Sequence, residues 1–467
     1  MRLHELRIPQ LRIGPVEGLL LLALAVALGL ATTLSKPTLL IGLVAGCTLL
    51  VAAFLSTSLS LYILIFSMLL SPELAFGRLE GRGVGGRGIT IRLDDILLLI
   101  IGFTWLAKTI IYRELGLIKR TPLNWPIMLY MAACILATLL GVLTGRVQLA
   151  TGFFYLLKYF EYFFIFFMVV NNVRTREQMV HLLVAVLVTG FLTSLYAISL
   201  IPSGQRATAP FEGGSGEPNT LGGYLVFMMA IATGLLLHVR GAAVRGGLVA
   251  LLGLLGLALM ATLSRTSYVA AGGLIVALLA TQWRRPAVLA TVLVGAILLP
   301  LIAPDNVKQR VSETFYGKKY GGEITVGGVT VDYSTTERLR SWAVVIRDWS
   351  RRPLFGYGVT GYAWADAQYV KILGETGIAG IVAFFFLIWS LWKRVRESLL
   401  AEQDPVCRGL ALGFLLGLIA MLAHAVGANT FIIIRIMEPF WLCAGLVVAL
   451  PMLQNKITAT SRAQVPV

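Results

Sequence analysis

The sequence is poor in charged residues and in the residue types that bind metals. Asp, Glu, Lys and Arg together make up 13% of its 467 residues, whereas a soluble protein has about 25%. The four cysteines have neither zinc-type spacing nor the pattern of a disulfide framework, and no two of the four histidines are close enough to form a metal pair. These shortages exclude an ordinary soluble domain and a recognisable metal centre, and we expect no metal and no other cofactor.

Apolar residues are abundant and form long runs. Hydrophobic residues make up 57% of the chain, and the mean hydropathy is +0.83. Runs of about 18 to 22 residues can cross the hydrocarbon core of a bilayer as helices, so we predict an all-α polytopic membrane protein with about fourteen transmembrane helices. Their approximate cores are residues 17–34, 37–55, 59–75, 94–112, 125–144, 152–171, 179–200, 220–237, 247–263, 267–281, 287–303, 368–391, 409–427 and 433–452.

Lysines and arginines alternate along the loops and predict the topology. They concentrate in every second loop, which places both termini in the cytoplasm and accounts for most of the net charge of +16 without a nucleic-acid partner. No cleavage site of small residues accompanies the first run, so we expect a retained helix rather than a signal peptide. Residues 77–93 break the pattern, because they are expected outside yet contain four arginines. Either a span is miscounted there, or these arginines face something anionic.

The predicted spans and loops divide the chain into four parts. These are N-terminal transmembrane helices (1–150), central transmembrane helices (151–303), a long extracytoplasmic loop (304–367) and C-terminal transmembrane helices (368–467). In the long loop, alternation around Gly327-Gly328 predicts a short hairpin, and Ser334 to Glu337 resembles a capping box that opens a helix. We expect that helix to be amphipathic and to lie on the outer membrane surface. Its apolar stripe consists of Leu339, Trp342, Ile346 and Trp349.

Arginines on the expected outer side come from distant parts of the sequence. Arg265 lies in the turn Ser264-Arg265-Thr266 between two closely spaced spans, with no acidic residue nearby in the sequence. It either extends to the membrane interface or faces a substrate path inside the helix bundle. Further cations expected on that side are Arg206, Arg338, Arg340 and Arg435. Because guanidinium groups suit phosphate oxygens, we expect a phosphate-bearing lipid as their ligand.

Lys158 and Glu161 interrupt a span that is otherwise apolar and rich in aromatic residues. Their i, i+3 spacing would allow the two charges to neutralise each other. Alternatively, Lys158 contributes to substrate binding. The sequence leaves both interpretations open.

Several stretches resemble the O-antigen ligase and Wzy-type polymerase superfamily. The stretches RLRSW (338–342), PLFGYG (353–358) and ETGIAG (375–380) resemble the family's signature region. The Ser264-Arg265-Thr266 turn, and Arg206 followed by Glu217-Pro218-Asn219-Thr220-Leu221-Gly222, resemble two earlier family elements. The likeness extends over roughly residues 150–450, and the order of the stretches is more specific than any one of them.

The resemblance implies a GT-C-like membrane glycosyltransferase that works without a metal at the outer face of the cytoplasmic membrane. Its donor would be an undecaprenyl-pyrophosphate-linked oligosaccharide, and a flippase and a chain-length regulator would be further partners. Positioned arginines would hold the charge that develops on the leaving diphosphate. We assign catalytic roles to Arg265 and Arg338. We assign substrate-binding roles to Arg206, Asn219, Lys158, Arg340, Gln368 and Arg435.

The sequence departs from the ligases at one position. Ligases have a histidine before the Glu-Thr-Gly stretch, and Asp366 occupies that position here. We predict that Asp366 activates the acceptor hydroxyl as a general base; the alternative is an N-cap of the following helix. Because Asp-x-Gln-Tyr resembles polymerase-like members, a polymerase is favoured over a ligase. A transporter is the alternative from another class, but no inverted repeat supports it.

Overall fold

The protein is described by a computed structural model over residues 57–71, 73–76, 89–111, 120–211, 216–302, 304–316, 325–326, 329–330, 333–362 and 365–463. Within these ranges, eight helices are long and apolar enough to cross a membrane. This finding confirms the prediction of a helical polytopic membrane protein. The predicted cores 17–34 and 37–55 lie outside the described residues, and every other predicted core overlaps a helix.

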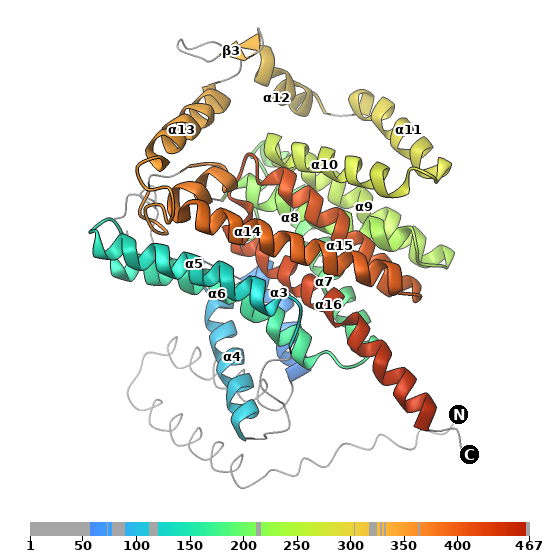
Figure 1. Ribbon diagram of the computed structural model, residues 1–467. Helices are drawn as coiled ribbons and strands as arrows, with labels where there is room; N and C mark the ends of the chain where they lie inside the picture. Colours follow the sequence, from blue (N-terminus) through green and yellow to red (C-terminus); the bar gives the residue numbers. More distant parts are fainter. Residues whose placement is uncertain are drawn as a thin grey trace, which may run out of the picture.

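Most of the described helices form one bundle, and a smaller group arches along one side of it (Figure 1). The bundle includes α3 (Thr57–Leu70), α5 (Asn124–Leu143), α6 (Leu149–Asn172), α7 (Arg176–Ser199), α8 (Pro218–Leu236), α9 (Ala242–Thr262), α10 (Arg265–Gln282), α14 (Gln368–Ala401), α15 (Pro405–His424) and α16 (Ile434–Ala463). The arch is formed by α11 (Pro286–Ile302), α12 (Asp305–Tyr316), β3 (Thr325–Val326), β4 (Val329–Thr330) and α13 (Tyr333–Trp349). Helix α4 (Leu93–Ile111) follows a short antiparallel pair, β1 (Glu73–Phe76) and β2 (Ile89–Arg92).

Helices α8 and α15 pack with their backbones in contact. Gly409, Gly413 and Gly417 recur every four residues along one face of α15, and a Cβ atom at Gly234 of α8 would overlap the backbone of Gly409 and Gly413. Small residues with this spacing allow helices to approach closely in a membrane. At the other end of the pair, Gly223 of α8 lies against the C-terminal residue of α15. The two helices are therefore antiparallel.

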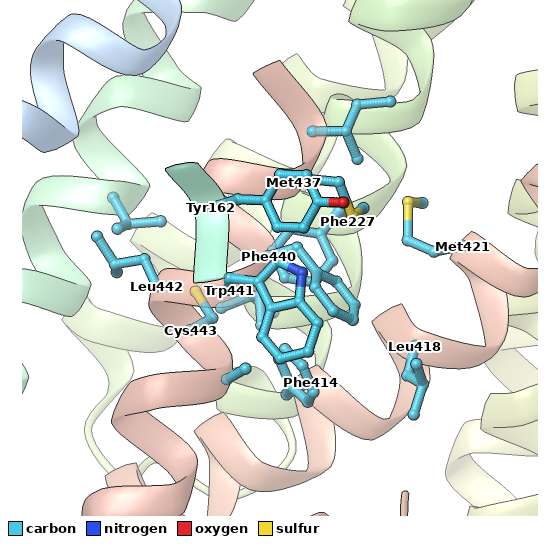
Figure 2. Close-up of a cluster of buried hydrophobic side chains, with 14 of the residues drawn as sticks. Tyr162, Phe227, Phe414, Leu418, Met421, Met437, Phe440, Trp441, Leu442 and Cys443 are labelled. Carbon is cyan, nitrogen blue, oxygen red and sulfur yellow. The ribbon is translucent and has the colours of Figure 1, made fainter. Parts of the chain in front are cut away.

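An aromatic core lies where α6, α8, α15 and α16 meet. Figure 2 shows Tyr162, Phe227, Phe414, Phe440 and Trp441 directed toward one another from these helices. The ring centroids of Phe414 and Phe440 are 4.9 Å apart, and those of Tyr162 and Trp441 are 6.4 Å apart in a stacked arrangement. Most of helix α16 between Ile434 and Leu453 is buried. A helix that is apolar on all sides suits this central position.

The stretches 353–358 and 375–380 form one structural unit. Helix α14 is interrupted at Gly377, whose φ of 64° and ψ of −159° suit glycine. The backbone N–H groups of Tyr357 and Gly358 donate to the carbonyls of Gly374 (3.0 Å) and Glu375 (2.8 Å). On the other side of the break, the N–H groups of residues 378 and 379 donate to the carbonyls of residues 353 and 354, at 2.8 and 3.0 Å. Backbone groups freed by the break are therefore satisfied by the turn, as a membrane interior requires.

Glu375 strengthens this unit through its side chain. Its Oε1 accepts hydrogen bonds from Lys371 Nζ at 2.7 Å and from the backbone N–H of Thr360 at 3.0 Å. Both Lys371 and Glu375 are buried. The signature stretches of the sequence thus have a clear scaffolding role in this fold.

The arch differs in detail from the sequence-based prediction. Strands β3 and β4 pair across Gly327-Gly328, where the hairpin is predicted. Helix α13 begins at Tyr333, so Ser334 lies inside the first turn and the predicted cap position is wrong. Val345 is 2% exposed and lies against Gly374, whereas Ile346, which was expected on the apolar stripe, is 51% exposed. Packing against α14, rather than the apolar stripe alone, determines which face of α13 is buried.

Candidate functional site

The N-termini of α8 and α10 meet at one end of the bundle. Leu263 adopts a left-handed conformation that ends α9, and Ser264 is the N-cap of α10, where its Oγ accepts from the backbone N–H of Ser267 at 3.2 Å. Ser264 Oγ also donates to Oδ1 of Asn219, in the first turn of α8, at 2.6 Å. Helix N-termini carry partial positive charge and free N–H groups. Two such ends therefore face the same region.

Three arginines, which we call the guanidinium cluster, accompany these helix ends: Arg206, Arg265 and Arg310. Arg265 is the first residue of α10, and Arg310 belongs to α12. Arg206 donates from Nε and Nη2 to the carbonyls of Thr262 and Leu263, each at 3.1 Å. Arg206 is exposed as a whole residue, but partial burial of its guanidinium group, together with the charges of Arg310 and Arg265, lowers its pKa. Arg310 also forms an ion pair with Glu313 on α12 at 3.2 Å. Because like charges repel one another, the proximity of these arginines still favours an anionic ligand.

Arg338 and Arg340 share helix α13 but differ in surroundings. The charge of Arg338 acts on the imidazole of His424, which places Arg338 near the same end of the bundle. Arg340 is exposed and forms an ion pair with Glu337 on its own helix at 2.8 Å. Exposed ion pairs of this kind contribute little to the stability of a protein. Of the two, the structure brings only Arg338 toward the helix ends described above.

Asp366 and Gln368 lie where the arch returns to the bundle. The N-cap of α14 is Ala367, without a side-chain cap, so the alternative that Asp366 is the N-cap is wrong. The Asp366 side chain is exposed, whereas Gln368 is buried. The Oε1 atom of Gln368 accepts from the N–H of Phe431 at 2.9 Å, and its own backbone N–H donates to the carbonyl of Ala425 at 3.0 Å. Gln368 therefore fastens the start of α14 to the segment after α15.

The segment 425–431 links Asp366 with the turn that contains Arg265. On one side, Asn429 Nδ2 donates to the carbonyl of Ala365, next to Asp366, at 2.9 Å. On the other side, a Cβ atom at Gly427 would lie 2.9 Å from Oγ1 of Thr266. Segment 425–431 is thus in contact with both parts of the candidate site.

Lys158 belongs to a separate set of interactions, which we call the buried charge cluster. Its members are Arg92, Asp95, Lys158, Glu161 and Glu438. Lys158 pairs with Asp95 and lies 3.4 Å from Glu161, while Arg92 lies 3.7 Å from Glu438. All five side chains are at most 11% exposed. This pairing supports the interpretation that Lys158 and Glu161 neutralise each other.

The buried charge cluster also gives Arg92, from the anomalous segment 77–93, carboxylate partners inside the protein. The other arginines of that segment, Arg78, Arg82 and Arg87, lie outside the described residues.

Arg435 is buried and holds three chain segments together. Its Nη1 donates to the carbonyls of Leu69 at 2.9 Å and Pro210 at 3.1 Å, and its Nη2 to that of Ser71 at 3.4 Å. Two of these carbonyls lie at the C-terminal end of α3, where a cation is favourable. These contacts give Arg435 a structural role.

Sequence reasoning missed two residues near the site. Arg310 follows the last span of the central part, in a helix for which no role was predicted. His424 is the last residue of α15 and is buried. A lone histidine inside an apolar run was the available signal, since polar residues in spans often mark function. Among the residues that the structure describes, no group of three or more His, Cys, Asp or Glu side chains is arranged to hold a metal ion.

Comparison with known proteins agrees with the sequence resemblance. Residues 248–385 match the model of a protein family described as O-antigen ligase. A search of curated proteins found no match. The matched range runs from α9 to α14 and includes the Arg265 turn, the arch and both stretches that form the broken-helix unit. The match confirms that the chain carries, over residues 248–385, the domain of the O-antigen ligase and Wzy-type polymerase superfamily.

Proposed function

We propose that the protein is a membrane glycosyltransferase that polymerises undecaprenyl-pyrophosphate-linked oligosaccharide repeats at the outer face of the cytoplasmic membrane. The family match supports a membrane enzyme of the O-antigen ligase or polymerase type. The observation that carries the proposal is the hydrogen bond between Ser264 and Asn219. It joins the N-termini of α8 and α10 beside Arg206 and Arg265, in a place suited to a diphosphate.

In the proposed reaction, stabilising the leaving diphosphate matters more than activating the acceptor hydroxyl. The acceptor hydroxyl oxygen bonds to the anomeric carbon of the donor, and the bond from that carbon to the diphosphate oxygen breaks. The electron pair of the broken bond remains on the diphosphate. Fixed dipoles and guanidinium groups lower the energy of this charge without rearranging during the reaction. Arg206, Arg265 and both helix N-termini are placed for this role, and Arg338 approaches from α13.

Asp366 is the proposed acceptor of the hydroxyl proton. Its side chain is exposed and does not cap α14. Segment 425–431 holds the start of α14 close to the Arg265 turn. Asp366 in place of the ligase histidine supports a polymerase, in which the acceptor is a second lipid-linked repeat.

The arrangement of helix ends supports an extracytoplasmic site. The same end of the bundle includes the starts of α8, α10, α14 and α16 and the ends of α7, α9 and α15. At the opposite ends, arginines lie in the connections between α6 and α7, α8 and α9, and α10 and α11 (Arg174, Arg240, Arg284 and Arg285), which supports cytoplasmic termini. At that opposite end, Arg176 pairs with Asp404, the N-cap of α15, at 2.7 Å. The partners we propose are the lipid-linked repeat, the bilayer, a flippase and a chain-length regulator.

The proposal is tested by incubating the purified protein with a lipid-linked repeat. A ladder of products of increasing length is expected. The family description favours one alternative, an O-antigen ligase that transfers finished glycan to lipid A core or another acceptor. A single transfer to a separate acceptor would show that alternative, and no transfer to either acceptor would contradict both.

A further inference from the structure

A chain of buried polar side chains connects α15 to the candidate site. His424 Nδ1 lies 2.8 Å from Thr430 Oγ1, and His424 Nε2 lies 3.3 Å from Ser267 Oγ. Ser267 Oγ lies 2.8 Å from Ser264 Oγ, which is bonded to Oδ1 of Asn219 at 2.6 Å. Thr430, His424, Ser267 and Ser264 are each at most 1% exposed. Only Asn219, at the far end of the chain, is partly exposed.

With Oδ1 of Asn219 facing Ser264, the direction of each other hydrogen bond in the chain follows. Oδ1 of Asn219 can only accept, so the hydroxyl hydrogen of Ser264 points to it. Ser264 must then accept from Ser267, which uses the hydroxyl hydrogen of Ser267. The oxygen of Ser267 is left to accept from Nε2–H of His424. In a neutral imidazole, Nδ1 then accepts from the hydroxyl of Thr430 at 2.8 Å, a shorter contact than the 3.5 Å from the same hydroxyl to the carbonyl of Ala428. This pattern couples one tautomer of His424 to one orientation of the Asn219 amide.

The backbone of α8 is shaped to receive this chain. A Cβ atom at Gly222 would overlap the hydroxyl of Ser267, and one at Gly223 would lie 2.9 Å from Cε1 of His424. The imidazole also interacts with the backbone of Asn219. Among the described residues, Nδ2 of Asn219 has no hydrogen-bond partner. Its two N–H bonds are therefore available to a ligand at the N-termini of α8 and α10.

We infer that His424 is a positioning residue that orients the Asn219 amide toward the diphosphate of the donor through Ser267 and Ser264. The inference rests on the proposed function, because it assigns the ligand of Asn219. His424 itself is buried and touches no substrate. Its contribution is to prevent the amide from turning its carbonyl oxygen toward the negative charge. Loss of His424 should weaken donor binding more than it slows the chemical step.

The experiment measures KM for the lipid-linked repeat and kcat in purified wild-type protein and three variants: Asn219→Ala, His424→Asn and His424→Gln. Asn219→Ala removes the proposed hydrogen bond to the charged ligand, and His424→Asn removes the contact that orients the Asn219 amide, so each should raise KM about tenfold. His424→Gln should keep KM within about threefold, because the Gln amide nitrogen can replace Nε2 as the donor to Ser267. In all three variants kcat should change less than KM. His238→Gln is the matched control, since His238 lies beyond the opposite end of α8.

The outcomes separate the inference from the proposed function. If Asn219→Ala raises KM but His424→Asn does not, the inference is overturned and the proposed function stands. The inference also fails if both His424 variants only lower the yield of folded protein and leave KM unchanged. If His424→Asn does not fold, Ser267→Ala takes its place and should raise KM to the same extent. Absence of glycan transfer by the wild-type protein would contradict the proposed function itself.

Discussion

The buried charge cluster and the guanidinium cluster use charge in opposite ways. In the first, cations and carboxylates from β2, α4, α6 and α16 pair inside the protein. In the second, arginines from three segments lie close enough to lower the pKa of Arg206, beside two helix N-termini. Breaking a buried pair leaves an uncompensated charge and is destabilising, whereas arginines that lie close to one another favour an anionic ligand. The two clusters therefore distinguish charged residues that support the fold from charged residues that are placed to bind a ligand, in a chain where charged residues are rare.

Removing one partner from the buried charge cluster should have the largest effect. Lys158→Met removes the cation that lies 3.4 Å from Glu161 and leaves Asp95, among the described residues, with Arg92 alone, at 3.9 Å, so the free energy of unfolding should fall by about 3–5 kcal/mol. Denaturant unfolding in detergent measures this change. Lys308→Met, at an exposed lysine on α12, should change stability by less than about 0.5 kcal/mol. If Lys158→Met instead keeps wild-type stability and raises KM for the donor, Lys158 binds substrate and the comparison fails.

Removing one arginine from the guanidinium cluster should affect catalysis rather than stability. Arg265→Ala should lower the rate of glycan transfer by about 10²–10³-fold, the range typical of losing a group that stabilises developing charge. The thermal unfolding temperature should stay close to that of the wild type. Arg245→Ala, at an exposed arginine near the other end of α9, is the control. Equal rates for Arg265→Ala and the wild type would remove Arg265 from the site.

Asp366 should behave as a functional residue, like the guanidinium cluster. Asp366→Asn should slow transfer by about 10²-fold, because the amide cannot accept the hydroxyl proton. The free energy of unfolding should change by less than about 0.5 kcal/mol, since the side chain is exposed. Asp305→Asn, at an exposed aspartate of α12, serves as the control for kinetics in the same assay. A wild-type rate combined with lowered stability would show that Asp366 is structural.

A substitution at Gly377 tests the broken-helix unit that residues 353–358 and 375–380 form. Gly377→Ala forces a side chain into a conformation with φ of 64° and places Cβ 2.5 Å from the backbone of Leu354. The free energy of unfolding should fall by about 1–3 kcal/mol. Gly256→Ala in α9 is the matched control, because nothing lies within 4 Å of its Cβ position. The account of the broken helix is wrong if both substitutions have the same effect.

The smallest expected effect concerns Asp348 at the end of α13. The Tyr362 hydroxyl donates to Asp348 Oδ2 at 2.8 Å and lowers the pKa of that carboxyl. A lowered folded-state pKa stabilises the protein above the unfolded pKa of about 4, and this stabilisation is lost as pH falls through the folded value. Tyr362→Phe should therefore be slightly less stable than the wild type at pH 7, and the difference should shrink below pH about 4. A difference that does not vary with pH would contradict this.

The sequence predicts the helices of the bundle because membrane-spanning segments need long apolar runs, which are visible without a structure. It also singles out the turn at Arg265, since charge is rare in such a chain. It does not predict the buried charge cluster, because Arg92 and Glu438 are far apart in the sequence. Nor does it show how residues 353–358 dock at Gly377, since those hydrogen bonds join backbone groups. His424 was overlooked because its partners come from α10 and from the segment after α15.

The most direct test of the account is a structure of the protein with a polyprenyl diphosphate bound. We predict that the diphosphate lies within hydrogen-bonding distance of Arg206, Arg265 and the Asn219 amide, at the N-termini of α8 and α10. A diphosphate bound elsewhere, with these side chains directed to lipid or bulk water, would contradict the account.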